Sequence, residues 1–198
     1  MKILHLISSP KQEGSFSVQL GNDIVAKLQS KYPGSTVVTR NLGATPFPHL
    51  EEVHFTSFFT PAEARTDMQV NALKHSDEAV AQLMEADIIV IGVPVYNFAI
   101  HSSLKTWIDH VVRAGVTFKY GENGPEGLVN GKKVYLAISS GGVFSDDSRN
   151  GLDFSEPYLK AILGFIGLKD ITTYRVEGLA IPGVKERALE RAVEAVAV

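Results

Sequence analysis

Cysteine is absent from this 198-residue sequence. Its absence excludes disulfides, thiolate nucleophiles, iron–sulfur clusters and zinc sites that need sulfur ligands, so any redox chemistry must use a bound cofactor. The charge is also nearly balanced, with 22 acidic and 19 basic residues and a formal net charge of −3. No broad positive field is available to collect nucleic acid or anionic lipid, and we expect neither nucleic acid nor a membrane as a partner.

Long hydrophobic runs are missing as well. The apolar run at residues 3–7 is far too short to span a membrane or to form the core of a signal peptide, and no small-residue cleavage site follows it. We therefore expect a cytoplasmic protein. With 44% apolar residues, the chain is long enough for one well-packed domain and short for two, which predicts a single domain over residues 1–198.

Two familiar glycine-rich phosphate loops do not occur. The sequence has no G-x-x-x-x-G-K-[ST], and its first turn lacks G-x-G-x-x-G. Arg40 and Asn41 stand where a ribose-binding acid would follow a second strand. They could bind a 2′-phosphate, a minor alternative without the glycine fingerprint.

Short β-branched runs alternate with longer helical patterns. Such an order is typical of a doubly wound α/β fold, a five-stranded parallel sheet with helices on both faces. The runs are nearly continuous in apolar residues, which predicts strands buried on both faces. They span residues 3–7, 36–39, 88–93, 134–138 and 171–176.

Apolar residues at helical spacing occupy the intervening segments. Leu20, Ile24 and Leu28 make a crossover helix that ends at residues 32–34, and Thr60-Pro61-Ala62-Glu63 predicts a capping box at the start of the next helix. Further helices are expected at residues 103–112 and 158–166 and after residue 183. The carboxyl ends of the strands are then where ligands should bind.

Hydroxyl groups dominate the loop after the first strand. Together with the amides of a helix N-terminus, Ser9, Ser15 and Ser17 can supply the donors that a phosphate monoester needs. The alternative is that Ser17 caps the helix and the other serines are ordinary loop residues.

Aromatic and amide groups gather at the end of the third strand, in Pro94-Val95-Tyr96-Asn97-Phe98. Tyr96 or Phe98 could cover the face of a flat heteroaromatic ring, and Asn97 could meet its polar atoms. The alternative is a turn whose two aromatic rings pack into the core.

The fourth strand ends in Ser139-Ser140-Gly141-Gly142. Missing side chains would let backbone amides approach a ligand edge, although a simple glycine turn is the alternative. Because strands one, three and four adjoin in a doubly wound sheet, the three motifs should face one crevice.

With these motifs, the chain resembles the bacterial FMN-dependent NADH-azoreductases, relatives of the flavodoxin-like NAD(P)H:quinone oxidoreductases. The resemblance covers nearly the whole chain, and residues 113–118, 123–128 and 163–167 support it further. It implies a flavodoxin-like fold with bound FMN and NADH as electron donor. The implied reaction is a two-electron ping-pong hydride transfer to quinones, with reductive cleavage of aromatic azo compounds to amines.

The resemblance also implies the site residues. The FMN phosphate would be bound by Ser9, Ser15, Phe16 and Ser17, the ring lined by Val95, Tyr96, Asn97 and Phe98, and its polar edge contacted by Ser139, Ser140, Gly141 and Gly142. Flavin N5 would be the reactive centre, with no catalytic side chain and no metal assigned.

A homodimer with shared active sites is implied too. Tyr120 and the partner's Phe165 would lie near the open flavin face, and Phe98 would line the same substrate pocket. Family members often have arginine where this chain has Ser140 and histidine where it has Phe144. We expect these two departures to bear on the preference for electron acceptors.

Phe55, Phe58 and Phe59 fall in a predicted long loop at residues 53–59, which we expect either to overhang the acceptor site or to pack beneath the surface. Two other functions stay open, a flavodoxin-like electron carrier and an NADPH-dependent FMN reductase. The modest charge does not favour the acidic docking face of a carrier.

Overall fold

The computed structural model describes residues 1–11, 13–146 and 150–198. Its centre is a parallel sheet with the strand order β2-β1-β3-β6-β7, which confirms the doubly wound topology. The strands agree with the expected runs to within a few residues. They are β1 (Lys2–Ile7), β2 (Thr36–Asn41), β3 (Ile88–Pro94), β6 (Lys133–Ser139) and β7 (Asp170–Val176).

Strand burial differs from the expectation at the two edges. β3 is buried throughout, whereas β2 is exposed or half-buried along its length and β7 is buried only at Val176. An edge strand has a neighbour on one side only, and helix α1 (Phe16–Lys31) packs mainly against β3 and β6. The prediction that all five strands are buried on both faces is therefore wrong for β2 and β7.

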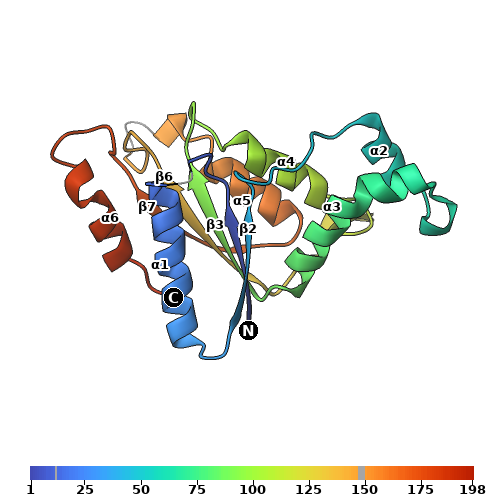
Figure 1. Cartoon of the computed structure of the whole chain (residues 1–198), viewed down its shortest axis with the longest axis horizontal. Coiled ribbons are helices and arrows are strands. Elements are labelled where there is room, and N and C mark those ends of the chain that lie inside the picture. Colours follow the sequence, from blue (N-terminus) through green and yellow to red (C-terminus); the bar gives the residue numbers. More distant parts are fainter. Residues whose placement is uncertain (12, 147–149) are drawn as a thin grey trace.

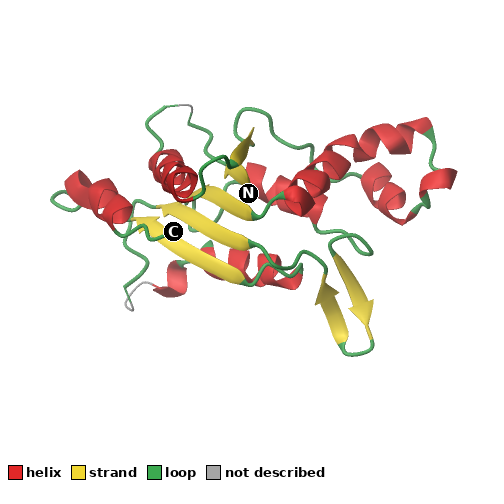
Figure 2. Cartoon of the chain, turned by 90° about the horizontal axis from the view of Figure 1, so that it is seen from below, coloured by secondary structure: helices red, strands yellow, loops and turns green. Residues whose placement is uncertain are grey.

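Two apolar layers hold helices to the sheet. Helices α1 and α6 (Lys185–Glu194) cover one face through residues such as Leu20, Ile24 and Ala188. Helices α3 (Asp67–Glu85), α4 (Ser102–Val111) and α5 (Glu156–Phe165) cover the other through residues such as Leu83 and Trp107. Figures 1 and 2 show helices on both sides of the sheet, as predicted.

The segment before β3 contains two corrections. Residues 53–59 were expected to form a loop but belong to helix α2 (Glu52–Phe59), whose start is closed by a capping box between Glu51 and His54. The predicted capping box at residues 60–63 is wrong, because Thr60 ends α2 and Ala62–Ala64 form only a 3₁₀ turn. Thr66 and Gln69 make the capping box that starts α3.

A small antiparallel hairpin completes the fold. It consists of β4 (Phe118–Gly121) and β5 (Gly124–Gly127), was not predicted, and projects from the body of the molecule in Figure 2. A second 3₁₀ turn spans Asn150–Leu152. Within the described ranges, the chain offers no helix of the length and apolarity needed to cross a bilayer.

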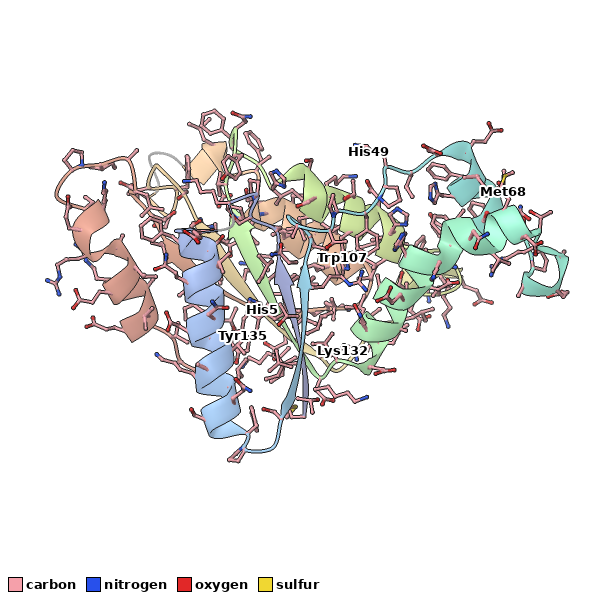
Figure 3. All side chains as sticks on the ribbon, in the orientation of Figure 1. His5, His49, Met68, Trp107, Lys132 and Tyr135 are labelled. Atoms are coloured by element: carbon pink, nitrogen blue, oxygen red, sulfur yellow. The ribbon has the colours of Figure 1, made fainter. Side chains whose placement is uncertain are left out.

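His5 of β1 is a buried titratable group beneath α1 (Figure 3). The residue is 3% exposed, its Nε2 finds no hydrogen-bond partner among the residues that the structure describes, and a Cβ on Gly21 of α1 would lie 2.9 Å from that atom. Gly92 of β3 allows a similar approach, since a Cβ there would lie 3.3 Å from the Ser17 carbonyl oxygen. Burial lowers the pKa of His5 from 6.5 to about 4.

His5 should make the protein sensitive to mild acid. Between pH 6.5 and about 4 the unfolded chain binds a proton that the folded chain does not, so the free energy of unfolding falls as the pH drops through this window. The loss attributable to His5 is at most roughly 3 kcal/mol and is complete near pH 4. Urea unfolding of wild type and His5→Gln at pH 7.5 and 4.5 measures it, with exposed His49→Gln as control. Equal pH dependence in all three proteins would contradict the prediction.

Candidate functional site

The carboxyl ends of β1, β3 and β6 meet at one edge of the sheet, as the strand order requires. A small open hollow of about 120 Å³ lies there, lined by residues of all three predicted motifs. They include Ser15 and Phe16, Val95 and Tyr96, and Ser140 and Gly141. A larger hollow of about 390 Å³ lies between β7 and α6, but none of the three motifs lines it.

The serine loop places hydroxyls at the N-terminus of α1. Ser15 is the N-cap residue, yet its Oγ makes no capping bond and lies 3.1 Å from Ser17 Oγ. The alternative in which Ser17 caps the helix is therefore wrong, because Ser17 is already in the first turn. Ser9, Ser15 and Ser17 are all buried.

Backbone donors at this helix start remain available. Among the described residues, no acceptor is found for the amides of Phe16, Ser17 or Val18, and the first turn of α1 carries no acidic side chain. Free amides and the positive end of the helix dipole together favour an anion. The loop therefore has the chemistry of a phosphate site.

The end of β3 is a strained turn. The backbones of Tyr96 and Ala99 exchange two hydrogen bonds of 3.0 Å, and the two residues between them have positive φ, 49° at Asn97 and 68° at Phe98. A left-handed conformation is unusual for phenylalanine and costs free energy that a surrounding structure must offset. Tyr96 and Phe98 are 38% and 49% exposed, so the alternative of two core aromatics is wrong.

The end of β6 offers backbone amides rather than side chains. Ser139 and Ser140 are buried, and the Ser140 hydroxyl donates to the Gly142 carbonyl at 2.8 Å. The carbonyls of Gly141 and Gly142 accept from Ala180 and Gly178, while within the described ranges their own amides have no acceptor. These two amides are therefore free to donate to a ligand.

Phe144 adds an aromatic ring that sequence patterns did not place. Its ring lies against Gly142, so a Cβ added to Gly142 would be 3.2 Å from Phe144 Cζ. The Phe144 ring also meets the Phe98 ring edge-on at a centroid distance of 6.2 Å. Phe154, 57% exposed, donates its amide to the Phe98 carbonyl at 3.2 Å. Phe98 is thus contacted by two separate segments, through its ring and through its carbonyl. No spacing pattern around Phe154 could have indicated this contact.

Tyr120 and Phe165 lie elsewhere in the chain. Both rings contact Phe118, with centroid distances of 5.5 Å from Tyr120 and 4.5 Å from Phe165. Phe165 ends α5, just before the start of β7, and therefore lies toward the amino edge of the sheet, opposite the hollow. Tyr120 is 75% exposed on the hairpin. One chain alone does not bring these two residues to Phe98.

The remaining candidates have ordinary partners. Arg40 is bonded to Gln82 and Glu78, and the Asn41 side chain accepts from the amides of Gly43 and Ala44, so neither offers a 2′-phosphate site. Helix α2 with its phenylalanines packs on α3 and projects away from the carboxyl end of β3 (Figure 1). In a single chain it therefore does not cover the hollow. Over the residues that the structure describes, no His, Asp and Glu cluster is placed to hold a metal ion.

Comparison with known proteins agrees with this geometry. The family model for the flavodoxin-like fold matches residues 1–198. FMN-dependent NADH:quinone oxidoreductase 1 of Rhizobium etli is 53% identical over 188 residues, which are 94% of this chain and 92% of that protein. The chain belongs to the FMN-dependent NADH:quinone oxidoreductase family. A second member of the family, from Rhizobium johnstonii, is 50% identical over 96% of this chain and 93% of its own.

Solved structures of similar proteins carry the name azoreductase. The azoreductase from Bacillus anthracis str. Sterne superimposes with a TM-score of 0.90 at 29% identity, covering 98% of this chain and 95% of that one. The FMN-dependent NADH-azoreductase from Bacillus anthracis str. Ames Ancestor, solved in complex with FMN, has a TM-score of 0.86 at 26% identity, with 98% and 97% covered. The quinone oxidoreductase family thus shares its fold with these azoreductases.

Proposed function

We propose that this protein is an FMN-dependent NADH:quinone oxidoreductase that also cleaves aromatic azo compounds to amines. The observation that carries the proposal is the convergence of an anion-binding helix start, an exposed aromatic turn and two free glycine amides at one edge of the sheet. The names of the relatives from Rhizobium and of the azoreductase structures support it.

The residues fit FMN in three parts. The phosphate matches the amides of Phe16 and Ser17 with the neighbouring hydroxyls of Ser9 and Ser15, where no acidic side chain of the first turn opposes it. The flat ring matches the turn Val95-Tyr96-Asn97-Phe98. Its polar edge matches the free amides at Gly141 and Gly142. We therefore assign these residues, with Ser17, Ser139 and Ser140 behind them, to the FMN site.

When bound, FMN supplies the redox chemistry, accepting a hydride from NADH and returning two electrons to the acceptor. The protein orients the reactants. Phe98 and Tyr96 present apolar surface on which flat molecules can stack, and the Gly141 and Gly142 amides stabilise negative charge at the ring edge. A single stacking face used in turn by NADH and the acceptor gives ping-pong kinetics without a general base.

Quinones should be the better acceptors. They need stacking and hydride geometry, whereas azo compounds need repeated reduction and a supply of protons. Phe144 at the site adds apolar surface and no titratable group. We also propose that residues 1–198 form one FMN-binding domain and that the enzyme works in the cytoplasm, where NADH is available.

We further propose a homodimer in which each site uses both chains. The cluster of Phe118, Tyr120 and Phe165 is exposed at Tyr120 and lies far from Phe98 in its own chain. A twofold axis would bring the partner's Tyr120 and the partner's Phe165, which lie together on Phe118, over the open face of the ring beside Phe98. The projecting hairpin β4–β5 supplies the reach that such a contact needs (Figure 2).

Rapid mixing under anaerobic conditions tests the activity. We expect the purified protein to be yellow, to retain flavin through dialysis, and to lose its visible absorbance within the first turnover when mixed with NADH. Absorbance then returns on addition of a quinone. An electron carrier would not be bleached directly by NADH, and a flavin-releasing reductase would lose its colour on dialysis, so either result would replace the proposed function.

Replacing Ser15 tests the phosphate site. Ser15→Ala should weaken FMN binding by roughly 1 to 2 kcal/mol, about tenfold, because one hydrogen bond to a charged group is lost. Helix stability should change little, since the Ser15 hydroxyl makes no capping bond. Fluorescence titration of apoprotein with FMN measures this, with Ser30→Ala at the exposed end of α1 as control. Unchanged affinity in Ser15→Ala and Ser17→Ala would place the phosphate elsewhere.

Light scattering and a Tyr120 variant test the shared site. The wild-type mass should be about twice the 21.5 kDa of one chain. Tyr120→Ala should raise KM for quinones several-fold by removing stacking area, while FMN affinity stays within about twofold because no phosphate contact changes. A monomeric enzyme, or a Tyr120→Ala variant with wild-type KM, would contradict the shared site.

A further inference from the structure

Arg175 of β7 is the centre of a largely buried ion cluster. Its guanidinium donates to Asp153 Oδ2 at 2.5 Å, to Glu177 Oε1 at 3.2 Å and to a Glu156 oxygen. The side chain of Arg175 is 15% exposed, and those of Asp153, Glu156 and Glu177 are 8%, 17% and 10% exposed. Arg175 therefore contacts three carboxylates, and Lys160 pairs with one of them, Glu156, at 2.7 Å.

The cluster is electrostatically expensive to build. Burial opposes ionisation of both partners, yet hydrogen bonds from Lys160, Arg175 and Thr173 hold the pKa of Glu156 down at about 2, and the carboxylates raise the pKa of Arg175. Buried ion pairs often contribute little net stability compared with apolar packing of the same volume. The main effect of such a cluster is then to fix the positions of the segments that carry its charged residues.

Two of the carboxylates also bind backbone amides, Glu177 those of another segment and Asp153 those of its own turn. Glu177 accepts from the amides of Phe144 and Ser145 at 2.9 and 3.1 Å. Asp153 accepts from the amides of Ser155 and Glu156 at 2.9 and 3.2 Å. Arg175 thus joins the segment at Phe144 to the segment at Asp153 through its carboxylate partners.

Both of these segments meet Phe98. The Phe144 ring contacts the Phe98 ring edge-on, and the Phe154 amide, next to Asp153, donates to the Phe98 carbonyl. Phe98 has a φ of 68°, a conformation that its own chain disfavours. Contacts from two anchored segments supply the constraint that such a turn needs.

We propose that Arg175 is a positioning residue that fixes the orientation of Phe98, and thereby sets which acceptors stack at the site. The effect on acceptor choice rests on the proposed function. The mechanical link between Arg175 and the turn at Phe98 does not. A purely structural role would lower overall stability without changing the turn or the choice between acceptors.

Hydrogen exchange tests the mechanical link in the holoenzyme. Arg175→Met should speed exchange of the paired amides of Tyr96 and Ala99 about tenfold by loosening the turn, and Arg175→Lys should restore part of the protection. The matched control is Arg187→Met, which breaks an exposed ion pair with Glu190 on α6 and touches neither segment. Peptides from the middle of α1 report any general loosening.

Acceptor selectivity tests the functional consequence. The ratio of kcat/KM for a two-ring over a one-ring quinone should shift about three- to tenfold in Arg175→Met and remain at the wild-type value in Arg187→Met. Phe144→Leu leaves the ion cluster in place and should shift the ratio the same way, with a non-additive effect in the double variant. Wild-type exchange at Tyr96 and Ala99 together with a wild-type ratio would overturn the proposal, as would additive effects of the two substitutions.

The outcomes stay separable from those of the proposed function. If Arg175→Met does not fold, Glu177→Gln weakens the link to the segment at Phe144 while leaving the Arg175–Asp153 pair in place, and is subjected to both measurements. If the wild-type holoenzyme is not bleached by NADH, the proposed activity fails while the exchange experiment still decides whether Arg175 holds the turn.

Discussion

The site depends on the parallel pairing of β1, β3 and β6. Because the three strands run in one direction in adjacent positions, their carboxyl ends meet, and the loops that follow them face one hollow. Each loop then contributes a different chemistry that comes mainly from the backbone. Helix amides, a left-handed aromatic turn and glycine amides need no titratable side chain, which suits a chain that leaves electron transfer to a cofactor.

Electrostatics at this edge comes from dipoles and neutral donors more than from buried cations. The helix start carries no acid, and the serine hydroxyls are enclosed by protein. A largely buried ionic cluster lies instead around Arg175 of β7. A net charge of −3 is therefore compatible with a phosphate site, since anion binding by a helix start is a local effect.

Prediction from sequence succeeded where one signal dominated. The apolar runs at residues 88–93 and 134–138 placed β3 and β6, and the three atypical strand ends placed the hollow. It failed at residues 53–63, where a histidine closes the capping box of α2 and a proline-containing segment imitates a helix start. Burial of β2 and β7 was misjudged because edge position follows from sheet order rather than from local pattern.

Long-range contacts were also beyond prediction. The contacts that link Arg175 through Glu177 and Asp153 to Phe98 join residues distant in sequence, and no periodic sequence pattern indicates them. The hairpin of β4 and β5 contains three glycines and a proline, a composition that does not indicate strands. Tyr120 and Phe165 were named from family resemblance. That resemblance did not indicate at which edge of the sheet a single chain places them.

The missing Cβ atoms of Gly21 and Gly92 have a consequence for ligand capture. They let α1 settle deep against β1 and β3, with the Ser17 carbonyl close to the strand below. The distance between the start of α1 and the sheet therefore depends on Gly21 and Gly92 having a hydrogen atom where other residues have a Cβ. A methyl at Gly21 would press on the His5 ring, and one at Gly92 would press on the Ser17 carbonyl, so the seating of the first turn of α1 on the sheet is set in the core beneath the hollow.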